Sequence, residues 1–145
     1  MGTRVAALLA AKGSEVVTID PTATVADMVG ELARRGIGAL VVSSDGARID
    51  GIVSERDVVR RMATYRGDLG TEPVSDIMST TVYTCAPDDT VDGLMATMTK
   101  HRVRHVPVVS DGVLHGIVSI GDVVKSRIDD LERDRRELEE YITAR

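Results

Sequence analysis

Apolar residues in the first half of the chain follow two periodicities in turn. Short β-branched runs predict strands, and apolar residues that recur every three or four positions from Val25 onward predict a helix. Thr24 is suited to cap the start of this helix, and Gly36 stands where a C-cap glycine belongs. The elements expected are strands at 16–19, 39–43 and 49–54, helices at 25–35 and 55–65, and an Asp-Gly turn at 45–46.

The second half repeats this pattern. Residues 116–125 echo residues 51–60, and residues 84–91 echo residues 18–25. The equivalent elements are strands at 82–84, 105–109 and 113–119, a turn at 111–112, and helices at 91–101 and from Ile120 onward. Such an internal repeat predicts two copies of one unit packed about a pseudo-twofold axis, with related sites between the copies.

The segments outside the repeats suggest how the copies are joined. Residues 5–11 predict a short amphipathic helix packed on the module, and residues 74–78 lead into the second copy much as residues 5–9 lead into the first. The polar stretch 66–73, which contains two glycines, is typical of a linker. We therefore expect the chain to divide into a first repeat with its leading helix and linker (1–73), a second repeat (74–127) and a C-terminal helix (128–145).

The C-terminal helix carries an apolar stripe at heptad-like spacing. Ile128, Leu131, Leu138 and Ile142 form the stripe, and Arg135 interrupts it. Two interpretations are open: a solvated helix with one apolar face, or a helix that packs on a partner subunit. The second is favoured because an exposed apolar stripe is stabilised when another chain covers it.

Composition narrows the class of protein. Of the 145 residues 43% are hydrophobic, which indicates a globular fold. Each repeat has about 60 residues and would bury only a marginal core alone, so we expect the two repeats to share one core. The net charge of −5 argues against general nucleic-acid binding. Cys85 is the only cysteine, which excludes an intramolecular disulfide, and no apolar run reaches the roughly 18 residues that span a membrane. We therefore expect a cytoplasmic protein.

Ser54-x-x-Asp57 and Ser119-x-x-Asp122 each stand where a predicted strand passes into a predicted helix. One interpretation is structural, because a serine followed three residues later by an acid forms a capping box. The other is functional, because a helix N-terminus suits phosphate and a carboxylate near it can accept hydrogen bonds from ribose hydroxyls. Both interpretations can hold at once.

The whole repeat resembles the CBS domain, and the pair resembles the tandem CBS (Bateman) module. The resemblance rests on Gly-Ile-Val-Ser followed by x-x-Asp-Val-Val, found at 51–59 and 116–124, and on Val-Pro-Val-Val-Ser-Asp-Gly at 106–112. It covers nearly the full chain and is similar to small stand-alone bacterial CBS-pair proteins. It implies an α/β (α+β) fold of two β-α-β-β-α repeats with adenosine nucleotides bound between them.

The resemblance also implies two clefts. In the first cleft Asp122 is the ribose-binding acid, with Ser119 and Gly121 beside it. The opposite repeat contributes residues that border the nucleotide or its base, and Arg104 and His105 match positions that face the phosphate. The bordering residues are Thr18, Ala23, Ile37, Gly38 and Ala39.

In the second cleft, Ser54 and Asp57 form the ribose side, and the residues opposite are Thr84, Val103 and Arg104. Two positions differ from the first cleft: Asp89 replaces Ala23, and Arg56 replaces Gly121. The second cleft is therefore expected to be more crowded and more charged, and the first to be the better binding site.

These observations predict a non-enzymatic regulatory sensor that binds AMP, or alternatively ADP, ATP or NAD, and that forms a homodimer. No nucleophile–base pair or metal cluster is recognisable, since His101 and His105 have metal-like spacing but lack a third ligand. Two other functions are open. One is an interaction dimer whose Ser-x-x-Asp motifs are only helix caps. The other is a nucleic-acid-binding accessory protein that uses the basic stretch 100–105.

Overall fold

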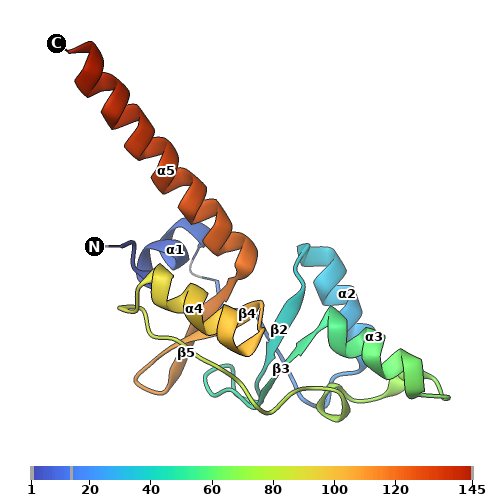
Figure 1. Ribbon diagram of the computed structural model, residues 1–145. Coiled ribbons are helices and arrows are strands. Elements are labelled where there is room, and N and C mark those ends of the chain that lie inside the picture. Colours follow the sequence, from blue (N-terminus) through green and yellow to red (C-terminus); the bar gives the residue numbers. More distant parts are fainter. Residues whose placement is uncertain (1, 14, 145) are drawn as a thin grey trace.

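The two copies of the sequence repeat fold into two units that lie side by side, and one long helix projects from the second (Figure 1). This computed structural model describes residues 2–13 and 15–144. Two ends of predicted segments lie outside the described residues: Met1, where the first predicted domain begins, and Arg145, where the predicted C-terminal helix ends. The elements are α1 Val5–Lys12, β1 Thr18–Ile19, α2 Val25–Arg35, β2 Ala39–Val42, β3 Gly51–Ser54, α3 Glu55–Thr64, α4 Val91–His101, β4 His105–Ser110, β5 Val113–Ser119 and α5 Ile120–Thr143, with short 3-10 turns η1 Leu69–Thr71 and η2 Val74–Asp76.

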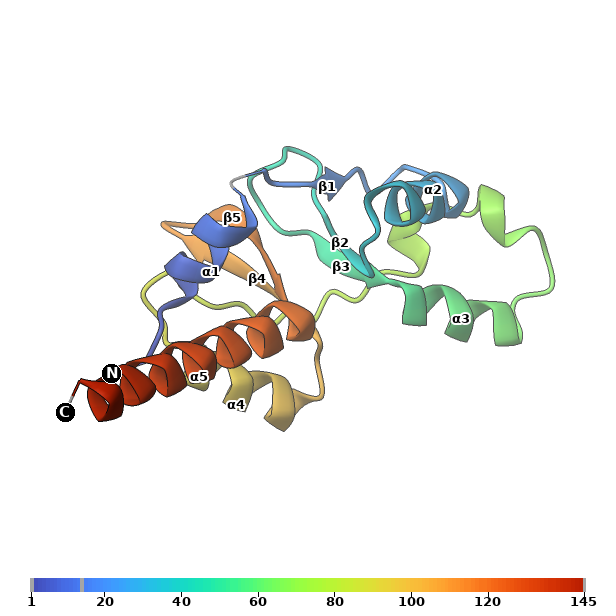
Figure 2. The same ribbon diagram turned by 90° about the horizontal axis from the view of Figure 1, so that it is seen from above.

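The first repeat has a three-stranded sheet in the order β1-β2-β3, and the second has a two-stranded antiparallel sheet, β4-β5. Helices α2 and α3 lie with the first sheet, whereas α1, α4 and α5 lie with the second (Figure 2). The family fold is confirmed, as are the order of elements predicted for the first repeat and the predicted caps. The Thr24 hydroxyl accepts the Asp27 N–H at 3.1 Å, and Gly36 is left-handed.

Three strand predictions need correction, the first because β1 begins at Thr18 and not at residue 16. The predicted strand 82–84 does not form, and only Cys85 makes a single parallel bridge, to Val108. Pro107 stands in β4 where β2 has Val41, and it has no N–H to donate to a neighbouring strand. The predicted strand 49–54 begins only at Gly51. Before it, Asp50 still donates its N–H to Val42 O at 2.8 Å, and its carboxylate accepts the Ser44 N–H at 2.8 Å, a side-chain bond across the loop between β2 and β3.

The shared core expected from the sequence is also wrong, because each repeat has its own cluster of buried side chains. Each cluster includes a residue from the segment that leads into the other repeat. Val5 is buried in the second cluster and donates its N–H to Asp89 O at 2.9 Å, whereas Val74 is buried in the first and donates to Ala23 O at 2.8 Å. This exchange joins the repeats, since each fully buried valine stabilises the fold by about 1.5–3 kcal/mol.

Helix α5 continues without a break from the second repeat into the C-terminal segment, so the predicted boundary at 127/128 falls inside one helix. The division into three segments stays a prediction. The apolar stripe of α5 is exposed, with Leu131, Leu138 and Ile142 each 60–63% accessible. Within the ranges that the structure describes, no helix is both long enough and apolar enough to cross a membrane.

Candidate ligand-binding clefts

Both Ser-x-x-Asp motifs form capping boxes at the start of a helix. The Ser54 N–H and hydroxyl donate to Asp57 Oδ2 at 2.8 and 3.1 Å. Ser119 makes the same two contacts with Asp122 Oδ2, at 2.8 and 3.0 Å. The structural interpretation of the motifs is confirmed, and their role toward a ligand stays a prediction.

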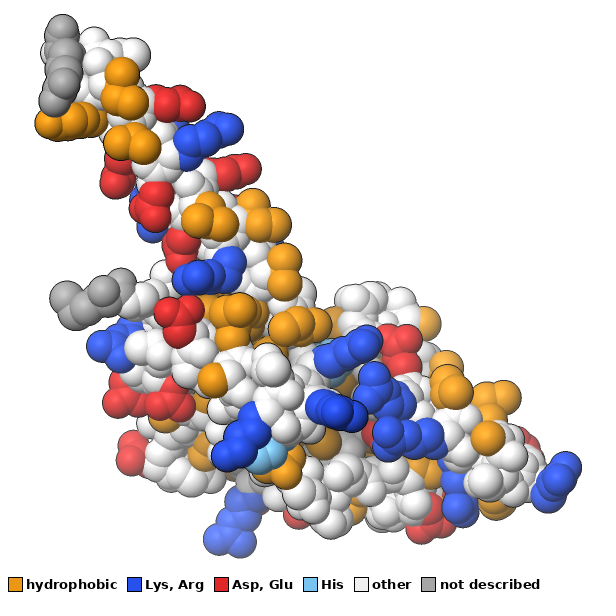
Figure 3. Space-filling model, viewed as in Figure 1, with side chains coloured by type: hydrophobic (Ala, Val, Ile, Leu, Met, Phe, Trp, Pro, Cys, Tyr) orange, Lys and Arg blue, Asp and Glu red, His pale blue; other side chains and the backbone are white. Residues whose placement is uncertain are grey.

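A cleft of about 480 Å³ lies beside Asp57 and is lined by both repeats. It contains most residues predicted for the second cleft: Ser54, Arg56, Asp57, Val103 and Arg104. It also contains three residues predicted for the first: Gly38, Ala39 and His105. Its remaining lining includes Ile52, Glu55, Arg60, Ser79, Thr81, His101 and Arg102. Figure 3 shows Lys and Arg side chains gathered on this face between α3 and α4.

Asp122 lies in a different environment, because Lys12 at the end of α1 occupies the space beside it. Lys12 Nζ donates to Asp122 Oδ2 at 2.8 Å and to Ile117 O at 2.6 Å. Ile37 and Ala39 line a pocket of about 300 Å³ on one side of Lys12. Asp122 lines a groove of about 660 Å³ on the other, so Lys12 separates the predicted ribose-binding acid from the predicted base-binding residues.

The Lys12 contact also sets the charge state of Asp122. Burial alone would raise the pKa of Asp122, but the hydrogen bonds from Lys12 and Ser119 and the positive charge of Lys12 hold that pKa below its usual value. Asp122 is therefore ionised and already paired. A ribose would have to compete with the lysine for it.

The remaining predicted residues do not come together around either acid. Thr18 is in β1, paired with Val41, and Ala23 packs against the first core cluster. Neither these two nor Thr84 lines the Asp57 cleft. Asp89, which was expected to crowd that cleft, instead accepts the Ala86 N–H at 2.8 Å and closes a turn.

Gly121 and Gly38 each lie near an acid, but they differ in the space that a side chain would find there. A Cβ at Gly121 would lie 3.6 Å from Ser119 Oγ, an ordinary contact. A Cβ at Gly38 would lie 2.8 Å from Glu55 Oε1 and 3.4 Å from His105 Nε2, so a larger residue there would require the Glu55 carboxylate to move. Burial lowers the pKa of His105, as does the charge of Lys12, against the opposing effect of Glu55.

Sequence reasoning missed Lys12, Arg60 and Arg102 as residues of the clefts. Arg60 lies one turn beyond Arg56 on the same helix, a spacing that would have placed it on the same face. Lys12 left no such signal, since it is far from both motifs in the sequence.

Two further observations concern metal binding and the single thiol. Within 2–13 and 15–144 no three His, Cys, Asp or Glu side chains come close enough to hold a metal ion. Burial, with a smaller effect of Asp89, raises the pKa of Cys85 to about 11, so the thiol is protonated at neutral pH.

Comparison with known proteins identifies the repeat. The family model for the CBS domain matches residues 12–64 and again residues 74–129. The crystal structure of a CBS-domain-containing protein from Agrobacterium tumefaciens has a TM-score of 0.82 and 42% identity, over 86% of this chain and 99% of that one.

Two further relatives extend the comparison. The mitochondrial CBS-domain-containing protein CBSX3 of Arabidopsis thaliana is 35% identical over 123 residues, which are 82% of this chain but only 60% of the plant protein. The CBS domain pair of protein MJ0100, crystallised with 5′-methylthioadenosine and S-adenosyl-L-methionine, has a TM-score of 0.75 at 23% identity, over 85% of this chain and 98% of that one, and so shares the fold. With both repeats matched and the fold in common, this chain belongs to the CBS-domain family.

Proposed function

We propose that this CBS pair is a cytoplasmic, non-enzymatic regulatory module that binds an adenosine nucleotide between its two repeats. The observation that carries the proposal is the cleft of about 480 Å³, which Ser54 and Asp57 of the first repeat line together with Val103 and Arg104 of the second. Its volume lies within the ~300–1,000 Å³ typical of small-molecule pockets. A ligand in such a cleft contacts both repeats and can change how they sit against each other.

Asp57 has the chemistry for the ribose. Only its Oδ2 takes part in the capping box, and in the described part of the chain Oδ1 accepts no hydrogen bond. Oδ1 is therefore free to accept from the vicinal hydroxyls of a ribose. Ala39 on the same cleft is small, and a planar base could pack beside it.

The adenosine part of the proposal is supported by the MJ0100 pair, because both of its ligands contain adenosine. The phosphate part rests on the arginines of the cleft. AMP is the smallest ligand that would use one ribose contact and one phosphate contact, and ADP, ATP and NAD are the alternatives.

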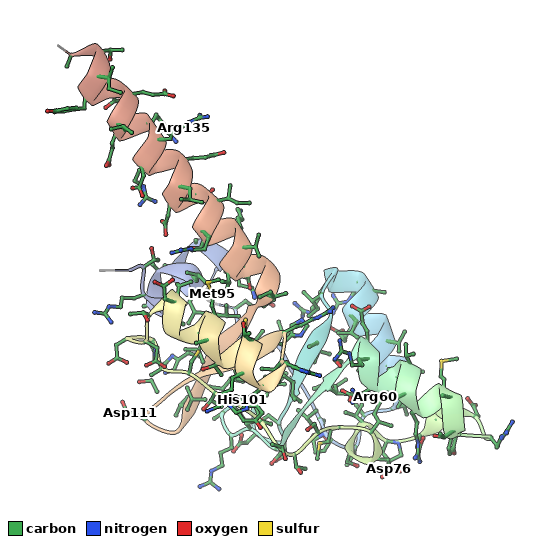
Figure 4. The ribbon with its side chains drawn as sticks, viewed as in Figure 1. Arg60, Asp76, Met95, His101, Asp111 and Arg135 are labelled. Atoms are coloured by element: carbon green, nitrogen blue, oxygen red, sulfur yellow. The ribbon has the colours of Figure 1, made fainter. Side chains whose placement is uncertain are left out.

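Calorimetry with adenosine, AMP, ADP, ATP and NAD tests the proposal, together with melting scans, since a ligand of the folded state raises Tm. Asp57→Asn should weaken binding by about tenfold or more, because a charged acceptor of hydrogen bonds is lost. Asp111→Asn is a matched control, since Asp111 lies in the β4–β5 turn, away from the cleft (Figure 4). The proposal fails if none of the five compounds binds, or if both variants behave alike.

A second candidate function is an interaction protein that needs no ligand, and the exposed stripe of α5 favours it. We propose that this stripe packs on a second copy of the chain. Each apolar side chain buried there would contribute about 1.5–3 kcal/mol before ordering costs. Truncation after Lys125 should then weaken the dimer in sedimentation experiments. A truncated protein that remains a dimer of unchanged strength and melting temperature would show that the stripe is merely solvated.

A further inference from the structure

The Asp57 cleft is lined by four arginines, two from each repeat. Arg56 and Arg60 come from α3, and Arg102 and Arg104 come from the segment that follows α4. Figure 4 labels one residue on each side of the cleft, Arg60 on α3 and His101 at the end of α4. Four side chains of one charge therefore meet at one cleft.

None of the four guanidinium groups is neutralised by a residue in the described part of the chain. Among residues 2–13 and 15–144, their side chains make no ion pair and no hydrogen bond with another residue. The chain has 23 acidic and 18 basic residues, so carboxylates are in excess. Among the described residues that line the cleft, the acids are Glu55 and Asp57. Its charge is thus opposite in sign to that of the whole molecule.

Arg102 adds a second, independent observation. It ends α4 in the left-handed conformation, with φ 55° and ψ 42°. Gly36 ends α2 in nearly the same conformation, with φ 64° and ψ 38°. Glycine adopts this conformation without strain, whereas a side chain at the same place opposes it. The second repeat therefore has a strained arginine where the first has the residue that the backbone favours.

The pocket of about 300 Å³ beside Lys12 has no such charge. Its cations are Lys12 and Arg35, and both are paired. Lys12 contacts Asp122, while Arg35 bonds Glu31 at 2.8 Å and Glu15 at 3.1 Å. An anionic ligand gains little there, because it would have to displace carboxylates that are already in place.

We propose that the Asp57 cleft selects a nucleoside ligand with two or more phosphates, and that Arg102 is a specificity-determining residue that contacts the phosphate chain. This inference rests on the proposed nucleotide binding and adds to it the charge class of the ligand. Arginine donates to phosphate oxygens in pairs, and each added phosphate brings further acceptors into reach of the four guanidinium groups. The strain at Arg102 persists because a glycine would supply no such contact.

The test compares adenosine, AMP, ATP and inorganic tripolyphosphate by calorimetry, at low and at moderate salt. In the native protein ATP should bind about tenfold or more tightly than AMP, with the difference shrinking as salt rises. Arg102→Gly should lower ATP affinity about tenfold and leave adenosine affinity unchanged. The same variant without ligand should melt about 2–5 °C higher, because the strain is relieved. Arg136→Gln removes an exposed arginine of α5, outside the cleft, and should change none of these values.

The outcomes separate this inference from the proposed function. If tripolyphosphate binds and Arg102→Gly abolishes that binding while no adenosine compound binds, the arginine site stands and the adenosine proposal falls. If AMP and adenosine bind as tightly as ATP, or if Arg102→Gly leaves ATP affinity intact, the inference is overturned. A single-stranded RNA oligomer that outcompetes ATP would overturn it as well.

Discussion

The two clefts of this CBS pair begin with the same motif and end with different chemistry. Ser54–Asp57 and Ser119–Asp122 form nearly identical capping boxes, with Oδ2 as the acceptor in both. Lys12 Nζ is paired with Asp122 at 2.8 Å, whereas Asp57 faces a cleft with four arginines for which the described residues provide no ion pair. A repeated motif therefore does not imply a repeated site.

The difference arises in the chain that leads into each repeat. On the Asp122 side that chain is helix α1, which brings Lys12 onto the carbonyl of Ile117. On the Asp57 side it is an extended segment, in which Ser79 pairs with the backbone of Ile52 through two hydrogen bonds of 2.9 Å. An ammonium group fills one cleft, and short polar side chains leave the other open.

The segments that carry Val5 and Val74 each pack on the other repeat. Substitutions in these segments should have the largest effect on stability. Val5→Ala and Val74→Ala each remove two methyl groups from a fully buried position and should each lower the free energy of unfolding by about 2–3 kcal/mol. Urea titration measures both values. Val113→Ala, at an exposed strand position, is the control. A small effect at either buried site would mean that the lead-in segment is dispensable for that repeat.

Ligand binding distinguishes the two acids. We expect Asp57→Ala to weaken nucleotide binding by about 1.5–3 kcal/mol and Asp122→Ala to weaken it less, because Lys12 already occupies Asp122. This order is the reverse of the one expected from the sequence. Calorimetry on both variants decides between them. Losses that are small and equal would leave both motifs as helix caps alone.

The ion pair between Lys12 and Asp122, which distinguishes the two clefts, can be tested by removing the Lys12 ammonium group. Lys12→Met should lower stability at pH 7 by about 1 kcal/mol or less, as for a partly exposed ion pair. Because the folded pKa of Asp122 is below 3.8, its usual value, the stability from its ionised form is present above that value and is lost as pH falls through the folded pKa. Urea unfolding from pH 7 to acid should show a smaller acid loss in Lys12→Met than in the native protein. Equal acid loss in the two would exclude Lys12 as the cause of the lowered pKa.

Gly121→Ala should have the smallest effect on stability, and it tests directly which of the two acids the ligand lies beside. Alanine fits without clash and should raise stability by about 0.5 kcal/mol, since the full helix-interior difference of about 1 kcal/mol is not reached in a first turn. Nucleotide affinity should stay unchanged if the ligand lies beside Asp57. A loss of affinity, measured by calorimetry, would instead locate the ligand beside Asp122.

Much of the fold could be read from local patterns. The caps at Thr24 and Gly36 and the capping boxes follow from residue types within a few positions of one another. The errors came where one residue outweighed the pattern around it. Pro107 has no N–H to donate to a strand at 82–84, although the residues there favour one, and the Asp50 carboxylate bonds the Ser44 N–H across the loop before β3.

The sequence by itself determined the repeat, the order of its elements and the two helix starts at which the acids stand, because each depends on short-range periodicity and capping. Only the tertiary structure decided which charges share a cleft. Lys12 reaches Asp122 across 110 residues of sequence, and Arg56 and Arg102 come from different repeats. Such contacts depend on how α1 and the two sheets pack against each other, and no spacing within the chain encodes that geometry.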